Sequence, residues 1–239
     1  MTRLLVGVFF ISAICFSTVV TAKGYVEVHY TYVDNIKAKF ALPSGTGKVP
    51  GIVYNPDDFI NWGSEKAARA SGYDLEKWLR FFRQRGYAII IPQRKRKNPH
   101  AVKGALEFLS NHPRVDKNNL YVISMGNAAL TTLMAHDSPN KIKKCVLICP
   151  EPLDDTGYNS FPQLMRSTNS IKSEVLILGT INESIWRTQI QENMFKLLRK
   201  HGIKTQIKRY YYRKRWFWYP EHVFMGDIMD FLNASKNTY

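Results

Sequence analysis

The pattern of hydrophobic and polar positions predicts an opening hairpin followed by alternating strands and helices. Residues 25–32 and 37–42 alternate apolar and polar side chains, and the turn-forming segment 33–35 separates them. Short apolar runs such as Ala88–Ile91 then alternate with stretches whose apolar residues recur at helical spacing. The expected order after the hairpin is strand 51–54, helix 75–82, strand 88–91, a helix from Pro99, strand 120–123, helix 126–136, strands 145–149 and 174–178, helix 190–201, strand 205–211 and helix 223–232.

This alternation predicts both the fold class and the edge of the sheet where a site lies. Strands that alternate with helices form a mostly parallel sheet with helices on both faces, so we expect an α/β fold that follows an antiparallel hairpin. Ligands of such sheets bind beyond the carboxyl ends of the strands. The loops of interest therefore follow Tyr54, Ile91, Ile123, Cys149, Leu178 and Tyr211.

The first 22 residues have the features of a secretory signal peptide. Arg3 gives a positive start, residues 4–16 are almost wholly apolar, and small residues precede the expected cleavage after Ala22. The apolar run is short for a membrane span, and an uncleaved N-terminal anchor is the alternative. We expect residues 23–239 to form one exported domain, periplasmic or secreted, that does not span a membrane.

The chain is strongly basic, with 34 lysines and arginines against 19 aspartates and glutamates and a formal net charge of +15. Such a charge favours an anionic substrate, a membrane surface or a polyanionic glycan, although a generally basic proteome is an equal alternative. The sequence has no nucleic-acid-binding motif, so we expect no nucleic-acid partner. The oligomeric state is left open.

Two cysteines follow the predicted signal, Cys145 and Cys149. Residues four apart on a strand are separated by roughly 13 Å, which is too far for a disulfide. Their spacing also fits no zinc pattern. We expect two buried thiols, and neither a metal nor an organic cofactor.

The segment from Val115 to Ala129 carries the most specific functional signal. An apolar strand ends at Ser124, and a helix rich in small residues follows at once. This arrangement is typical of the strand–turn–helix elbow that presents a nucleophilic serine. Glycine is normal two residues before and after the serine; Gly126 satisfies the second position and Val122 departs from the first. A serine at a plain strand end is the alternative.

At these residues the chain resembles the α/β-hydrolase family, in particular its small dienelactone-hydrolase-like members. The resemblance rests on the order and spacing of residues 111–116, 124–126 and 175–180 (NHPRVD, SMG and VLILGT) over nearly the whole mature chain. It implies hydrolysis of carboxylic esters, with Ser124 as the nucleophile. A serine needs a base, and His222 follows the last strand, where the family's histidine resides.

The resemblance places the acid of the triad at Asn182, which carries no negative charge. The acid holds the histidine and stabilises its charged form, so its replacement weakens the expected catalysis. Three alternatives follow: Glu151 serves after the Cys149 strand, Glu183 serves from the next position, or Asn182 suffices for a slow reaction.

The oxyanion hole is expected to take one backbone N–H from Met125, the residue after the serine. The second donor would come from the loop after Tyr54, where Pro56 has no N–H and Asp57 is the remaining donor. This loop lacks the family's usual His-Gly pair, which is a second departure from the family pattern.

Two basic clusters follow predicted strand ends near this site. Arg94 and Arg96 follow strand 88–91, whereas Arg213 and the aromatic Trp216 follow the last strand. Cations interleaved with aromatic rings suit sugars, lipid headgroups or anionic polymers. We therefore expect these residues to bind a small-molecule or glycan ester with negative charge. Aromatic residues that pack on the core beside solvated charges are the alternative.

Two hypotheses about function result. The first is an exported serine hydrolase that cleaves carboxylic esters, with a preference for anionic substrates. The second is a weakened or inactive protein of the same fold that binds an anionic ligand, a glycan or a membrane surface. The departures at Val122, Asn182 and Pro56 motivate the second hypothesis.

Overall fold

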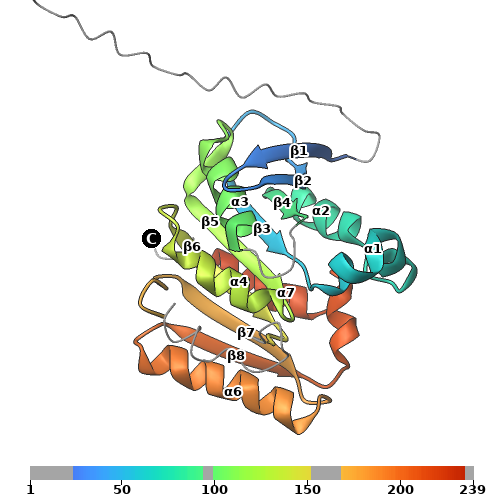
Figure 1. Cartoon of the computed structure of the whole chain (residues 1–239), viewed down its shortest axis with the longest axis vertical. Helices are drawn as coiled ribbons and strands as arrows, with labels where there is room; N and C mark the ends of the chain where they lie inside the picture. The colour runs from blue at the N-terminus through green and yellow to red at the C-terminus, as the bar shows by residue number, and fades with distance from the viewer. Residues whose placement is uncertain (1–23, 94–98, 152–167, 235–239) are drawn as a thin grey trace, which may run out of the picture.

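A computed structural model describes residues 24–93, 99–151 and 168–234. Its strands form one sheet in the order β1-β2-β4-β3-β5-β6-β7-β8 (Figure 1). β2 pairs antiparallel with β1 and β4, and the other neighbours are parallel, which confirms the predicted fold class. The elements are β1 Val26–Thr31, β2 Asn35–Ala41, β3 Val49–Asn55, α1 Phe59–Ala70, α2 Leu75–Gln84, β4 Ala88–Pro92, α3 Pro99–Asn111, β5 Val115–Met125, α4 Ala128–Met134, the 3₁₀ helix η1 Ala135–Asp137, β6 Ile142–Ile148, β7 Glu174–Thr180, α6 Ile185–Lys200, β8 Thr205–Tyr210, the 3₁₀ helix η2 Lys214–Trp218 and α7 Phe224–Asn233.

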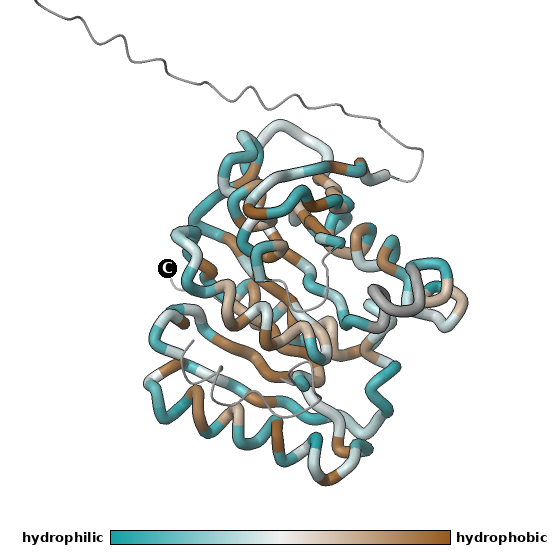
Figure 2. Tube along the Cα trace, viewed as in Figure 1, coloured by the Kyte–Doolittle hydropathy of each residue, from teal (hydrophilic) through white to brown (hydrophobic). Residues whose placement is uncertain are grey.

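Helices cover both faces of the sheet, and the sheet divides the core in two. Tyr54 of β3 packs in one core with residues of α2 and α7, whereas its neighbour Val53 packs in the other with residues of α3, α4 and α6. Successive residues of a strand point to opposite faces. In β5, Met125 accordingly belongs to the first core and Val122 to the second. The central strands are therefore apolar on both faces, as their hydropathy shows (Figure 2).

Aromatic packing fixes the segment after β8 against α2. Trp78 of α2 stacks on Tyr54 with ring centroids 4.2 Å apart, and its indole N–H donates to the carbonyl of Trp218 at 3.1 Å. Tyr73 stacks on the ring of Trp218 at 5.3 Å. Stacked aromatic rings are rigid and bury a large area. The segment between β8 and α7 is thus held over the carboxyl ends of the strands.

Several element bounds differ from those the sequence predicts. α1 is an additional helix, which is not among the elements predicted from the sequence. β5 continues through Met125 and α4 begins only at Ala128, so the turn between them lies further along the chain. Cys145 and Cys149 are buried free thiols, as predicted.

Two kinds of feature are absent from the described ranges. None of their helices is long and apolar enough to cross a bilayer. In the same part of the chain, no three histidine, cysteine, aspartate or glutamate side chains gather as ligands for a metal ion.

A buried histidine at the end of α4 makes the stability of the fold pH-dependent. Nδ1 of His136 lies 3.1 Å from the carbonyl oxygen of Thr132, and Nε2 lies 2.8 Å from Oγ of Ser173. Burial lowers the pKa of His136 to about 4. The folded state therefore holds the ring neutral, whereas the ring of the unfolded chain takes up a proton below its ordinary pKa of about 6.5.

Lowering the pH from 7.5 to 5 is expected to reduce the free energy of unfolding through His136 by about 2 kcal/mol. A depressed histidine pKa leaves this stability intact above about pH 6.5 and removes it progressively as the pH falls toward 4. Urea titrations at both pH values should show a smaller pH dependence in His136→Gln than in wild type. The control is His29→Gln at an exposed position of β1, which should keep the wild-type dependence.

Candidate active site

The turn between β5 and α4 is made by Gly126, two residues after Ser124. β5 ends at Met125, Gly126 has a φ of +60°, and α4 begins at Ala128. Glycine adopts positive φ without the steric cost that other residues incur. In the elbow expected here, the nucleophile itself occupies the sharp turn, which lifts its side chain out of the sheet. In this chain Gly126, which has no side chain, occupies the turn.

Ser124 lies within β5 and faces the core beneath α4. It has the same strand parity as Val122, which packs with α3, α4 and α6. Its strand partner Asn55 is also buried, and the amide of Asn55 donates to Oγ1 of Thr132 in α4 at 2.8 Å. Ser124 is fully buried, and its Oγ has no hydrogen-bond partner among the described residues. The hydroxyl is therefore under a helix and not at the edge of the sheet.

His222 lies just before α7, the helix that packs on the opposite face of the sheet. Its ring contacts those of Trp216 and Tyr219, with centroids 4.8 Å and 5.7 Å away. No residue of the described ranges hydrogen-bonds to the ring. The structure does not bring Ser124 and His222 together. His222 instead lines an open cavity of about 530 Å³ with Phe81, Gln84, Arg85, Pro220, Glu221, Met225, Gly226 and Met229.

Lys214 lies above the turn and contacts two carboxylates. Nζ of Lys214 lies 2.7 Å from Oε1 of Glu151 and 3.3 Å from Oδ2 of Asp57. A Cβ added at Gly126 would overlap Oδ2 of Asp57 and lie 3.3 Å from Nζ of Lys214. The loops after β3, β6 and β8 therefore meet over Gly126, and their charged side chains fill the space into which a nucleophile would project.

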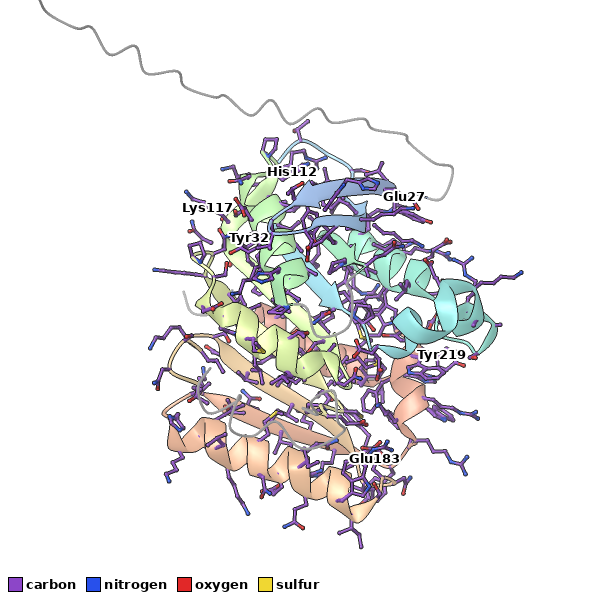
Figure 3. All side chains as sticks on the ribbon, in the orientation of Figure 1. Glu27, Tyr32, His112, Lys117, Glu183 and Tyr219 are labelled. Carbon is purple, nitrogen blue, oxygen red and sulfur yellow. The ribbon has the colours of Figure 1, made fainter. Side chains whose placement is uncertain are left out.

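Arg187 and Glu183 extend this arrangement toward α6. Nε of Arg187 lies 3.2 Å from Oε1 of Glu151, and Nη1 lies 3.9 Å from Oε1 of Glu183. Figure 3 places Glu183 and Tyr219 on the side of the molecule toward which the parallel strands point. We call the following five residues the charge cluster: Asp57, Glu151, Glu183, Arg187 and Lys214.

Burial and neighbouring charges fix the protonation of the charge cluster. Burial opposes the charge of Lys214, but the carboxylates of Asp57 and Glu151 more than offset it, so the pKa of Lys214 lies above its ordinary value. Burial raises the pKa of Glu183, although Lys214 acts in the opposite direction. Burial also raises the pKa of the Cys149 thiol. At neutral pH Lys214 is therefore protonated and has no lone pair with which to act as a general base.

The other predicted residues lie apart from one another. Asn182 is exposed, and its backbone N–H donates to Oγ1 of Thr180 at 3.1 Å. Met125 is buried within β5 and does not follow the turn, so it is not the donor that the elbow would supply. Arg213 and Trp216 are exposed after β8. Arg94 and Arg96 lie outside the described residues.

Sequence reasoning selected Asp57, Glu151 and Glu183 but missed the residues around which they gather, Gly126 and Lys214. The sequence did contain a signal for Gly126. Small residues at positions 124 and 128 flank Gly126 with the spacing that the elbow requires, which is a second register of the same pattern.

Comparison with known proteins reveals similarity in structure. No protein-family model matches the sequence, and no curated protein matches it. An esterase from Pyrobaculum calidifontis is 13% identical, with a TM-score of 0.66 over 88% of this chain and 82% of the esterase. EstE1, a thermostable carboxylesterase from a metagenomic library, is 14% identical, with a TM-score of 0.63 over 88% of this chain and 87% of the other.

A candidate dienelactone hydrolase from Klebsiella pneumoniae is 16% identical, with a TM-score of 0.58 over 85% of this chain and 90% of the other. These proteins share the sheet and the helical layers over most of the described residues. The chain has the α/β-hydrolase fold.

Proposed function

We propose that this protein binds a ligand at the carboxyl edge of its sheet and does not form a covalent intermediate on a serine. The observation that carries this proposal is the turn at Gly126. A side chain there would overlap Asp57, so the position that presents the nucleophile in this fold is both empty of a side chain and filled by a neighbour.

The surrounding groups support the same proposal. Nucleophilic catalysis needs a base within hydrogen-bond reach of the attacking hydroxyl. Lys214 stands over the turn but is protonated at neutral pH, and His222 packs among aromatic rings away from Ser124. The charge cluster therefore has the character of an ion-pair network, which fixes the loops in place without supplying a base.

A second candidate is an ester hydrolase, and the likeness to two esterases favours it. In that case Ser124 would attack a carboxylic ester with His222 as its base, and Glu151, Glu183 or Asn182 would supply the acid. Such a reaction requires α4 to move away from Ser124 and the segment before α7 to cross the sheet edge. For either function we propose, from the composition of the N-terminal segment, that residues 23–239 are exported.

Wild-type protein is expected to show no labelling by a fluorophosphonate probe above the level of Ser124→Ala. A buried hydroxyl without a base does not attack phosphorus at an appreciable rate. Labelling is measured by in-gel fluorescence beside an active serine esterase, and both proteins are checked for folding by circular dichroism. Hydrolysis of a panel of neutral and anionic p-nitrophenyl esters is followed in parallel.

Comparison of wild type with Ser124→Ala distinguishes the binding protein from the ester hydrolase. Labelling of wild type that disappears in Ser124→Ala, together with ester turnover that falls by about 10³-fold or more in the same variant, would contradict the binding proposal and support the hydrolase. Equal background signals in both proteins would leave ester hydrolysis through Ser124 without support.

A further inference from the structure

Five exposed apolar side chains gather beside the charge cluster. We call Ile181, Ile185, Trp186, Tyr211 and Trp216 the edge patch. Ile185 and Tyr211 are each 85% exposed, and the other three are 42–48% exposed. The described residues expose seven large hydrophobic side chains, and these five lie within three residues of Glu183, Arg187 or Lys214 along the chain. Scattered apolar side chains are normal on a surface, whereas a gathered set marks an interaction site.

The topology of the sheet brings these residues together. β7 and β8 are parallel neighbours, and Thr180 pairs with Tyr210 at their carboxyl ends. The N–H of Ile181 donates to the carbonyl of Tyr210 at 3.0 Å, so the two chains leave the sheet side by side. The rings of Tyr212 and Trp216 then lie tilted against one another, with centroids 5.9 Å apart. Ile181 and Tyr211 thus directly follow paired strand ends, whereas Ile185 and Trp186 begin α6 and Trp216 lies in η2.

Exposed arginines flank the edge patch in the part of the chain that the structure describes. Arg213 and Arg215 are exposed on either side of Lys214, and neither forms an ion pair with a described residue. The guanidinium of Arg187 lies 5.0 Å from the centroid of the Trp186 ring. The neighbouring carboxylates of Glu151 and Glu183 are buried, with side chains 9% and 4% exposed, and both face cations of the cluster. Among the described residues, the surface therefore presents apolar groups beside exposed arginines.

We propose that the edge patch docks this protein onto an anionic phospholipid surface. Tryptophan and tyrosine settle at the headgroup level of bilayers, and aliphatic side chains enter the acyl boundary below it. Arginines near an anionic bilayer add attraction, which the chain's net charge of +15 reinforces. An isoleucine as exposed as Ile185 can enter the acyl boundary of a bilayer, but it has no polar group with which to bind a polyanionic glycan. This difference favours a lipid surface over a glycan as the partner. This inference rests on the proposed binding function and identifies its partner.

Binding is measured by flotation with vesicles of phosphatidylglycerol and phosphatidylcholine, and with vesicles of phosphatidylcholine alone. The full chain is compared with a form that begins at Lys23, which retains every described element and lacks the apolar N-terminal run. We expect both to bind the anionic vesicles. Trp186→Ala/Trp216→Ala should weaken partitioning by about tenfold or more, because each ring buries apolar area. Arg213→Gln/Arg215→Gln should weaken it by roughly tenfold.

A charge-matched control separates the edge patch from net charge. Lys196→Gln/Lys200→Gln removes two cations from the far end of α6, so its binding should stay within about twofold of wild type. Equal losses in this control and in the arginine variant would overturn the proposal, as would absence of vesicle binding. Binding to soluble heparin that depends on the two tryptophans would assign the patch to a glycan instead. Fluorophosphonate labelling is independent of these results, so failure of the lipid proposal and failure of the binding function remain distinguishable.

Discussion

Replacing Lys214 by methionine is expected to lower the free energy of unfolding by about 3–5 kcal/mol. Methionine preserves the length of the side chain but removes the charge that Asp57 and Glu151 share. Both carboxylates are largely buried, with side chains 15% and 9% exposed, and each lies within 3.3 Å of Nζ. Loss of the cation removes the partner that the two carboxylates share and leaves Arg187 beside Glu151 alone, which is the costly way to break a buried ion pair.

The measurement is urea denaturation followed by circular dichroism at neutral pH. Lys77→Met is the matched control, because Lys77 pairs with Glu221 at 3.2 Å but both side chains are at least 40% exposed. An exposed pair contributes only about 0–1 kcal/mol. Adding Asp57→Asn and Glu151→Gln to Lys214→Met should recover most of the lost stability, since no unpaired charge remains. A loss in Lys214→Met no larger than that in Lys77→Met would show that the cluster is solvated and open.

The fold was predictable because its strands are continuous apolar runs separated by turn signals. A run such as Ile89–Ile91 has no solvent-facing alternative, so a two-sided, mostly parallel sheet follows from it. The rule that sites lie beyond the carboxyl ends of such strands also selected the loops that carry Asp57, Glu151 and Glu183, although Asp57 was expected as a backbone donor and the two glutamates as alternative acids. That these three carboxylates gather around one lysine is known only from the structure.

The centre of the site was not predictable in the same way. Ser124-Met125-Gly126 fits the elbow if the turn falls at Ser124, but the apolar strand continues through Met125 and the turn falls at Gly126. The position of a turn depends on how α4 packs on the sheet, and local sequence does not fix it to within two residues. Ser124 and Ala128 are then the small residues that let the helix approach the strand.

Lys214 was overlooked for a related reason. It stands between Arg213 and Arg215 in a basic run, and such runs usually form solvated faces. The 3₁₀ helix η2 turns the middle residue inward while its two neighbours stay exposed. The aromatic anchors Trp78 and Trp218 position that helix, and they lie 140 residues apart in the sequence. A contact over this distance leaves no local pattern.

Gly126→Ser, which introduces a hydroxyl at the turn, is expected to lower the free energy of unfolding by about 2–4 kcal/mol. The φ of +60° alone costs a non-glycine residue roughly 1–2 kcal/mol. The remainder arises because the new Cβ would overlap Oδ2 of Asp57, which must then move away from Lys214. We also expect no fluorophosphonate labelling of this variant, because the group beside the new hydroxyl is a protonated lysine and not a base.

Gly202→Ser isolates the backbone part of this effect. Gly202 has a φ of +74° and nothing within 4 Å of its added Cβ, so its substitution should cost only the conformational strain. The double variant Gly126→Ser/Asp57→Ala should recover part of the loss relative to the sum of the single changes, because the overlapping carboxylate is gone. A Gly126→Ser protein as stable as Gly202→Ser and labelled by the probe would show that the turn has room for a nucleophile. Such a result would contradict the expected overlap with Asp57, but it would not assign a nucleophile to the wild-type chain, because the labelled hydroxyl would be the introduced one and not that of Ser124.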